Sequence, residues 1–331
     1  MAASTDVPAA ATAREHRVPE FFVVGHHKCG TSALYEMLRR HPQIFMPDVK
    51  ETWYFSPELR SIGKRRRPAA ARPETMAQYL SLFDGASPDQ RVGENSPAYL
   101  MSHTAAARIG EAQPDAQIIA ILREPASFLR SFHLQCLRNH VETEKSFARA
   151  IALEGARREG KRIPRHSHRP HELLYSNHVR YVDQLRSYEA VFPRERILVL
   201  IYEDFRRDNE ATVRKVLSFL DVDDAAPIDV IEANPSFSVR SPKLHELVRS
   251  VYVGRGPVSR TVKAGVTSLT SRAVRRELLR LTRRRLVYGE PQSADEAVML
   301  ELRRRFKGEV VALSEHLDRD LVGQWGYDGL D

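Results

Sequence analysis

The sequence predicts an α/β fold in which helices flank a doubly wound parallel sheet, followed by a mostly helical C-terminal part. Three short apolar runs, at residues 21–24, 117–122 and 196–202, lack the polar alternation of a half-exposed strand. Such runs are typical of parallel strands that are buried on both faces. Each run leads into a segment with helical spacing, and strands alternating with helices indicate a parallel sheet with ligands at its carboxyl edge.

The elements are expected in a definite order along the chain. The first half should contain strand 21–24, helix 31–40, an extended piece at 43–45, a loop or lid at 56–74, helix 103–112, strand 117–122 and helix 125–138. A helical region at 146–160, helix 172–191, strand 196–202 and helix 208–220 should follow. Residues 241–320 are expected to be mostly helical, and the last helix shows an apolar stripe at Val298, Leu302, Phe306, Val310 and Leu313.

Helix boundaries rest on local chemistry. Leu34, Met37 and Leu38 stand at i, i+3 and i+4, which places them on one face of a helix that begins at about Thr31. Pro125 suits the first turn of the helix that follows the second strand, because its missing N–H costs nothing there. We expect residues 1–17 to be disordered and residues 18–325 to form one domain, with a core at 20–245 and a helical extension at 246–325.

The turn after the first strand is the most informative segment. Gly25 and Gly30 are four residues apart, as in a Walker A loop, and a strand-to-helix turn offers free N–H groups to a phosphate. However, Thr31 stands where the Walker lysine should follow, and Lys28 lies inside the loop. The sequence therefore predicts a fold like that of the P-loop NTPases with a phosphate cradle of another design.

The rearranged loop resembles the 5′-phosphosulfate-binding loop of sulfotransferases that use 3′-phosphoadenosine 5′-phosphosulfate (PAPS). That family carries a Pro-Lys-x-Gly-Thr-[ST] segment after its first strand, and here His27 occupies the usual proline position. The resemblance implies that the 5′-phosphosulfate is bound by Lys28, Cys29, Gly30, Thr31 and Ser32.

Further segments extend the resemblance over residues 20–245. Arg123 follows the second predicted strand, and the arrangement Arg-x-Pro…Ser resembles the family's 3′-phosphate motif, which implies that Arg123 and Ser131 bind that group. A planar guanidinium fork suits such a contact. The segment that begins at Gly93 (Gly-Glu-Asn-Ser-Pro-Ala-Tyr) looks like one in bacterial and heparan sulfate-type carbohydrate sulfotransferases, although Asn95 replaces a lysine of some members.

The resemblance implies transfer of a sulfuryl group from PAPS to a hydroxyl of a glycan, glycolipid or hydroxylated natural product, without a metal. Lys28 would stabilise the charge that grows on the leaving phosphate. Glu51 is the expected general base, because Lys-Glu-Thr-Trp-Tyr-Phe at 50–55 resembles the family segment that carries the base. Glu94 and His103 are further candidates for the base.

Composition favours an enzyme in a reducing compartment. Cys29 and Cys136 are the only cysteines of the 331 residues and make no disulfide framework, so a cytoplasmic location is expected. No signal peptide or transmembrane run is expected, and His166, His168 and His171 are read as a solvated loop and not a metal site. Arginines outnumber lysines 42 to 9, which suggests a GC-rich bacterial genome.

The formal net charge of +8 leaves alternatives open. A basic stretch begins at Arg272 and ends at Arg285, with interleaved leucines that would suit peripheral contact with an anionic membrane. Nucleic acid is not expected as a partner, because no recognition motif accompanies the charge. A P-loop kinase or NTPase, with Glu203 or Asp204 as its Walker B acid, and a noncatalytic polyanion- or membrane-binding protein remain alternatives. The acceptor and the oligomeric state stay undetermined by the sequence.

Overall fold

The computed structural model describes residues 17–60, 73–165, 167–230, 238–239, 288–289 and 295–330. Several expectations therefore lie outside the described residues. They concern the order of residues 1–16, the central part of the 56–74 loop, His166, most of the extension at 246–325, and the basic stretch from Arg272 to Arg285.

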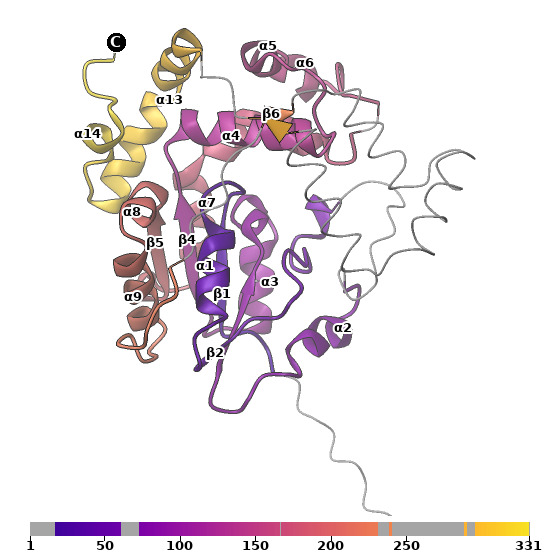
Figure 1. The fold of residues 1–331 in the computed structure, drawn as a ribbon. Coiled ribbons are helices and arrows are strands. Elements are labelled where there is room, and N and C mark those ends of the chain that lie inside the picture. The colour runs from indigo at the N-terminus through magenta and orange to yellow at the C-terminus, as the bar shows by residue number, and fades with distance from the viewer. Residues whose placement is uncertain are drawn as a thin grey trace, which may run out of the picture.

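Five parallel strands form the central sheet in the order β2-β3-β1-β4-β5 (Figure 1). Their bounds are Phe21–Gly25 for β1, Ile44–Phe45 for β2, Arg91–Asn95 for β3, Gln117–Leu122 for β4 and Ile197–Ile201 for β5. All five residues of β1 are buried, as are the last five of β4, which confirms the prediction of strands covered on both faces. The doubly wound sheet is confirmed, with β1 at its centre.

Helices connect and cover the strands on both sides. The helices of the first part are α1 (Thr31–Leu38), α2 (Met76–Leu80), α3 (Ala105–Ala112), α4 (Pro125–Arg138), α5 (Phe147–Ala152) and α6 (Glu154–Arg158). The later ones are α7 (Tyr181–Glu189), α8 (Tyr202–Arg207), α9 (Asn209–Phe219), α13 (Glu296–Leu317) and α14 (Leu321–Trp325), and β6 (Ser238–Val239) pairs with β7 (Tyr288–Gly289). Helix α1 packs beside α9 and α3 packs beside α7, as right-handed crossovers on two faces require.

Three expectations were wrong in detail. Residues 172–191 do not form one helix, because two 3₁₀ helices, Pro170–Leu173 and Tyr175–Val179, precede α7. The last strand ends at Ile201, and Tyr202 already begins the short helix α8. Strand β3 was not expected, because its sequence Arg-Val-Gly-Glu-Asn has neither an apolar run nor a high content of β-branched residues.

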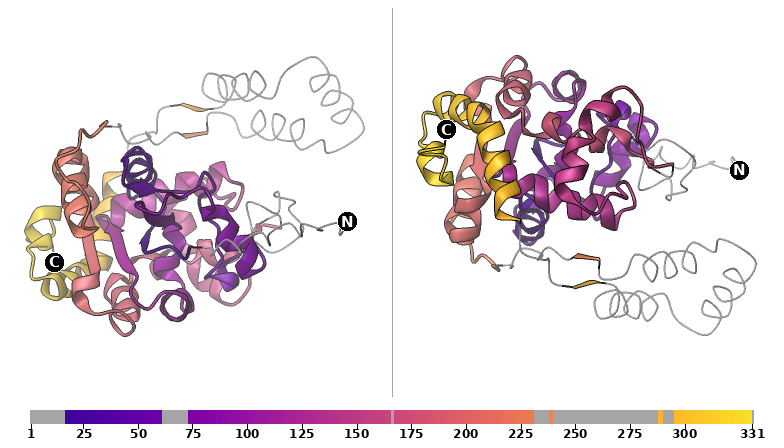
Figure 2. Two further views of the ribbon diagram at one scale, coloured as in Figure 1. Left: turned by 90° about the horizontal axis from the view of Figure 1, so that it is seen from below. Right: turned by 90° about the horizontal axis from the view of Figure 1, so that it is seen from above.

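The C-terminal helices α13 and α14 lie together on the side of the molecule that also holds α8 and β5 (Figures 1 and 2). The predicted stripe is confirmed for Leu302, Phe306, Val310 and Leu313, which are buried where α13 packs on α4 and α7. None of the helices within the described ranges has the length and apolar content needed to cross a bilayer.

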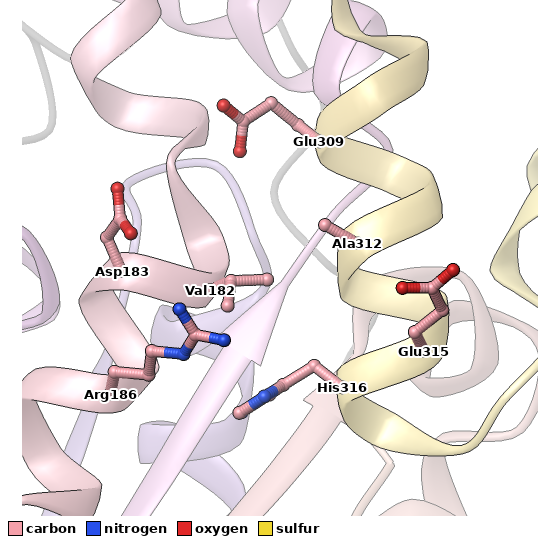
Figure 3. A pocket seen from close by; sticks show the side chains of 7 residues that line it. All are labelled: Val182, Asp183, Arg186, Glu309, Ala312, Glu315 and His316. Carbon is pink, nitrogen blue, oxygen red and sulfur yellow. The ribbon is translucent and has the colours of Figure 1, made fainter.

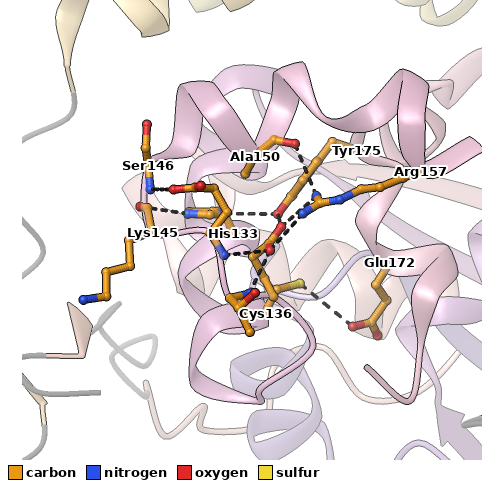
Figure 4. Close-up of polar contacts among 11 residues, drawn as sticks. His133, Cys136, Lys145, Ser146, Ala150, Arg157, Glu172 and Tyr175 are labelled. Carbon is orange, nitrogen blue, oxygen red and sulfur yellow. Dashed lines mark hydrogen bonds and ion pairs between the residues drawn. The ribbon is translucent and has the colours of Figure 1, made fainter. Parts of the chain in front are cut away.

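A buried polar network fixes the C-terminal end of α4 (Figure 4). Arg157 and Glu142 form an ion pair of 2.7 Å in which both side chains are inaccessible to solvent. Tyr175 donates to the same carboxylate at 3.2 Å, and its hydroxyl also lies 3.0 Å from Nδ1 of His133. Because a buried charge is tolerated only when it is paired and hydrogen-bonded, this network joins α4, α6 and the second 3₁₀ helix firmly.

Glu94 of β3 is a second buried carboxylate, fully removed from solvent. Its Oε1 accepts hydrogen bonds from Thr52, Ser96 and Tyr99 at 2.6, 2.6 and 3.0 Å, and its Oε2 accepts one from Tyr79 at 2.5 Å. Burial raises the pKa of Glu94, while these hydrogen bonds act in the opposite direction. The carboxylate thus ties the segment after β2 to the sheet.

We expect Glu94→Ala to lower the free energy of unfolding by about 3 kcal/mol or more, because several buried hydroxyls lose their acceptor. Urea unfolding followed by circular dichroism measures the change. Glu74→Ala, at an exposed position, is the matched control and should stay within about 0.5 kcal/mol of the parent. A loss below about 1 kcal/mol for Glu94→Ala would show that the hydroxyls find other partners.

Candidate active site

The turn between β1 and α1 has a backbone that only certain residues can adopt. Gly25 has φ 138°, and a Cβ there would lie 2.6 Å from the carbonyl oxygen of Ile121 on the neighbouring strand. Gly30 has φ 89°, and its Cβ would meet the ring of Phe205 at 2.9 Å. Lys28 also has a positive φ of 72°. Both glycines are therefore required, since each supplies a positive φ and a close approach.

The N-terminus of α1 presents hydrogen-bond donors to this turn. The first bonds of the helix run from the N–H groups of Ala33 and Leu34 to the carbonyl of Gly30. The N–H groups of Thr31 and Ser32 precede these bonds, so the helix itself supplies no acceptor for them. Asn95 donates to the carbonyl of Thr31 at 2.7 Å and fixes the first turn to β3. The turn can therefore hold an anion such as a phosphate.

The side chain of Lys28 lies close to two arginine side chains. Burial lowers the pKa of Lys28 to about 8, and the charges of Arg138 and Arg123 act in the same direction. An ammonium group in such surroundings gains most from a bound anion, because the anion compensates both the lost hydration and the repulsion. Lys28, which the sequence predicted as the charge-stabilising residue, is thus a partly buried cation beside other cations, and a bound anion would stabilise its charged form.

Strand register brings Arg123 to the same loop. Residues Leu122 of β4 and Ile201 of β5 are partners, so Arg123 and Tyr202 emerge side by side at the carboxyl edge. The guanidinium stands 4.5 Å from the centroid of the Tyr202 ring, and its Nη1 donates to the carbonyl of Lys28 at 2.9 Å. Its Nε is buried and has no hydrogen-bond partner within the described part of the chain. Ser131, 5% exposed, lies further along α4.

Glu51 follows β2, and a backbone hydrogen bond fixes its position. Its N–H donates to the carbonyl of Asn95 at 2.9 Å, and both Glu51 and Trp53 have positive φ values, 57° and 58°. Its side chain is one-third exposed, whereas Trp53 is buried. Positive φ at non-glycine residues is uncommon, costs free energy, and is enriched at functional sites. Oε1 of Glu51 lies 3.7 Å from Nδ1 of His27. This contact connects the candidate base to the turn at residues 25–30, which we call the phosphate loop.

Two side chains at the site were not singled out for a role by sequence reasoning. Lys50 Nζ lies 3.4 Å from Oγ of Ser32 and 4.6 Å from the centroid of the Tyr35 ring. Arg138 at the end of α4 acts on Lys28 through its charge. For Lys50 a signal existed, since it precedes Glu51 in the segment that resembles the family; for Arg138 nothing in the sequence marked the contact.

Other predicted site residues have different surroundings from those expected. Cys29 is fully buried, burial raises the pKa of its thiol to about 12, and its Sγ lies 3.9 Å from the carbonyl oxygen of His27. Glu94 is fully buried and accepts hydrogen bonds from four hydroxyl groups, so an acceptor molecule cannot reach it. His103 is exposed and stands 3.7 Å from Glu58. His171 belongs to a 3₁₀ helix and is half-buried, so the prediction of a solvated loop was wrong there.

The acids proposed for a Walker B role are engaged elsewhere. Glu203 accepts hydrogen bonds from the N–H of Glu124 at 3.4 Å and from Nε1 of Trp325 at 3.1 Å. Asp204 pairs with Arg207 and Arg319. Glu203 thus joins α8 to α14 and to the start of α4, and Asp204 joins α8 to the segment between α13 and α14. Within the described ranges, no group of three or more His, Cys, Asp or Glu side chains is arranged to hold a metal ion.

An open groove of about 410 Å³ lies between α7 and α13 (Figure 3). It is lined by Val182, Asp183, Arg186, Glu309, Ala312, Glu315 and His316. None of these belongs to the phosphate loop or to the segment of Glu51. The groove mixes acidic and basic side chains without a cation cluster, so it does not suit the anion that the loop is built to hold.

Comparison with known proteins places the chain in a family. The sequence model described as "Sulfotransferase family" matches residues 19–226. Carbohydrate sulfotransferase 15 of Mus musculus is 24% identical over 254 residues, which cover 62% of this chain and 44% of that protein. Heparan sulfate glucosamine 3-O-sulfotransferase 6 of Homo sapiens is 29% identical over 132 residues, covering 40% and 34%. The chain thus spans less than half the length of these curated relatives.

A solved structure agrees over almost the whole chain. The crystal structure of a sulfotransferase from Alicyclobacillus acidocaldarius superposes with a TM-score of 0.66 at 25% identity, and the match covers 93% of this chain and 99% of that one. The family match includes β1 to β5, the phosphate loop, Glu51 and Arg123. The chain therefore belongs to the sulfotransferase family.

Proposed function

We propose that the protein transfers a sulfuryl group from PAPS to a hydroxyl group of a glycan or of a smaller hydroxylated molecule. The observation that carries this proposal is the hydrogen bond from Arg123 to the backbone carbonyl of Lys28. It brings the guanidinium of Arg123 to the same anion-binding turn that carries the ammonium of Lys28. Family membership supports it, as do the names of the relatives, two of which are carbohydrate- and heparan sulfate-modifying enzymes.

The described residues fit PAPS. Lys28 and the N–H groups of Gly30, Thr31 and Ser32, with the backbone of Cys29, would hold the 5′-phosphosulfate. Arg123, with its unpartnered buried Nε, and Ser131 would hold the 3′-phosphate. In the reaction the acceptor oxygen forms a bond to sulfur while the bond from sulfur to the phosphate oxygen breaks. The products are a sulfate ester and adenosine 3′,5′-bisphosphate (PAP).

Charge accumulates on the leaving phosphate oxygen in this step. A cation placed there stabilises the transition state more than the ground state, and Lys28 is the residue that we assign to this role. The acceptor hydroxyl loses a proton to Glu51, whose carboxylate is part-exposed at the edge of the loop. The acceptor is a glycan or a small hydroxylated molecule, and the choice between them depends on experiment.

We also propose a reducing, cytoplasmic location in a bacterium. Both cysteines are free and buried, so neither depends on oxidation. The Alicyclobacillus acidocaldarius structure, which comes from a bacterium, supports this origin.

The decisive experiment incubates the protein with ³⁵S-labelled PAPS and an extract of its host, and identifies the labelled product by mass spectrometry. Calorimetry with PAP and with Mg-ATP supplies the second readout. Binding of PAP together with a labelled sulfate ester is expected. Tight Mg-ATP binding without PAP binding would instead support a kinase or NTPase, and salt-sensitive heparin or liposome binding without any transfer would support a noncatalytic role.

The first prediction concerns the charge of Lys28. Because its pKa is lowered to about 8, the side chain is charged below that pH and neutral above it, so kcat/KM for PAPS should fall about tenfold per unit above pH 8. Lys28→Arg should remove this alkaline limb. Lys28→Ala should lower kcat by about 10²-fold at pH 7. Lys161→Ala, at an exposed site, is the control. If Lys28→Arg keeps the alkaline limb, that limb belongs to a group other than Lys28.

A second prediction concerns Arg123. Arg123→Ala should weaken PAPS binding by about 2–3 kcal/mol, as expected for a charge-assisted contact. Adenosine 5′-phosphosulfate lacks the 3′-phosphate and should lose only about 1 kcal/mol, from the missing hydrogen bond to Lys28. Calorimetry with both ligands measures the difference. Equal losses would mean that Arg123 acts only by holding the loop.

A third prediction concerns the base. Glu51→Gln preserves the shape of the side chain and removes its basicity, so transfer should fall about 10²–10⁴-fold while PAP affinity survives. A phenolate acceptor, which needs no base, should be affected least. Transfer to an alcohol at nearly the parental rate would move the role away from Glu51.

A further inference from the structure

His27 stands between the phosphate loop and the candidate base. Its Nδ1 lies 3.7 Å from Oε1 of Glu51, and the two side chains are 12% and 33% exposed. The two residues come from different segments, the turn after β1 and the stretch after β2. Their approach is therefore a product of the fold and not of local sequence.

The imidazole of His27 is fixed by its neighbours. The ring of Phe132 lies parallel to it, with an interplanar angle of 2° and centroids 6.3 Å apart, and the ring of Trp53 lies at 6.2 Å. Its Nε2 is buried and has no hydrogen-bond partner in the described residues. Nδ1 is thus the nitrogen that meets a charged group at the surface of the loop.

Glu51, by contrast, has a fixed backbone and a less restrained side chain. Its N–H is bonded to Asn95, and its positive φ is enforced by the segment around it. A part-exposed glutamate populates several rotamers, and ordering them costs free energy. A polar side chain beside the carboxylate reduces this cost, because it restricts the rotamers that the glutamate adopts.

We propose that His27 is a positioning residue for Glu51, holding the carboxylate against the phosphate loop. The inference rests on the proposed function. In the transfer step the acceptor's proton goes to Glu51, and His27 touches neither the acceptor nor the sulfuryl group. The histidine occupies the position where the family motif has proline, so this chain has an additional polar contact at that point.

The other titratable and charged groups around His27 leave this pairing intact. They are His26 and Lys28 in its own turn, and Arg169, His171, Glu172 and His178 from the 3₁₀ helices and the segment before them. Burial lowers the pKa of His26 and of His171 to about 4 and that of His178 well below its usual value, so all three are neutral near pH 7. Glu172 is buried and paired with Arg169 at 2.7 Å, and the charge of His27 acts on it as well, so Glu51 is the part-exposed carboxylate beside His27.

The test compares His27→Phe, His27→Asn, Glu51→Gln and the double variant His27→Phe/Glu51→Gln with the parent. His27→Phe retains the ring between Phe132 and Trp53 and removes Nδ1, whereas His27→Asn places an amide donor near that position. Release of PAP from PAPS is followed against pH, with a heparan-type oligosaccharide or water as the acceptor. PAP affinity is measured by calorimetry. His316→Phe, which breaks a histidine–glutamate pair on α13 remote from the loop, is the matched control.

The expected result is a loss of about tenfold in kcat for His27→Phe, the size of one polar contact, with PAP affinity unchanged. His27→Asn should recover most of the rate. In the Glu51→Gln background, His27→Phe should cost nothing further.

Four results would overturn the proposal. These are a parental rate in His27→Phe, a loss that adds to that of Glu51→Gln, no recovery in His27→Asn, and a loss of PAP affinity equal to the loss of rate. If the parent releases no PAP at all, the proposed function fails and His27 falls with it. If Glu51→Gln is as fast as the parent, only the assignment of the base and its partner fails.

Discussion

Parallel pairing of β1 with β4 is the constraint on which the candidate site depends. Gly25, the last residue of β1, pairs with Ile121, one residue before the end of β4, so the turn after β1 meets the residues that follow β4. Gly25 permits the close approach, and Arg123 then reaches the carbonyl of Lys28. The lowered pKa of Lys28 is a consequence of this arrangement, because burial and neighbouring guanidinium groups act on one ammonium.

The C-terminal helices also support this edge of the sheet. Tyr327 donates to Glu124 at 2.5 Å, and Glu124 also caps α4 by accepting from the N–H groups of Ala126 and Ser127. Trp325 holds Glu203 at the start of α8. Residues about 200 positions apart thus fix the segment that carries Arg123, so the helical C-terminal part belongs to the support of the site.

The structure separates carboxylates that build the fold from the one assigned to chemistry. Glu94 and Glu142 are fully buried, and each is surrounded by donors that leave no room for an acceptor molecule. Glu51 is part-exposed, has an unusual backbone conformation and lies beside the phosphate loop. Exposure and donor count therefore favour Glu51 over Glu94 as the base, a distinction that neighbouring sequence alone does not provide.

Three strands of the sheet, the phosphate turn and the resemblance to the family could be predicted from the sequence alone. Apolar runs mark β1 and β4, which are buried along nearly their whole length, and β5, of which the last two residues are buried. The glycine spacing marks the turn because its backbone needs positive φ. Strand β3 escaped because Gly93, Glu94 and Asn95 are selected by tertiary contacts and not by strand propensity. Only the tertiary structure decided that His27 meets Glu51, that Lys50 and Arg138 join the site, and that Cys29 is buried. Each of these depends on distances between segments remote in sequence, which no local pattern encodes.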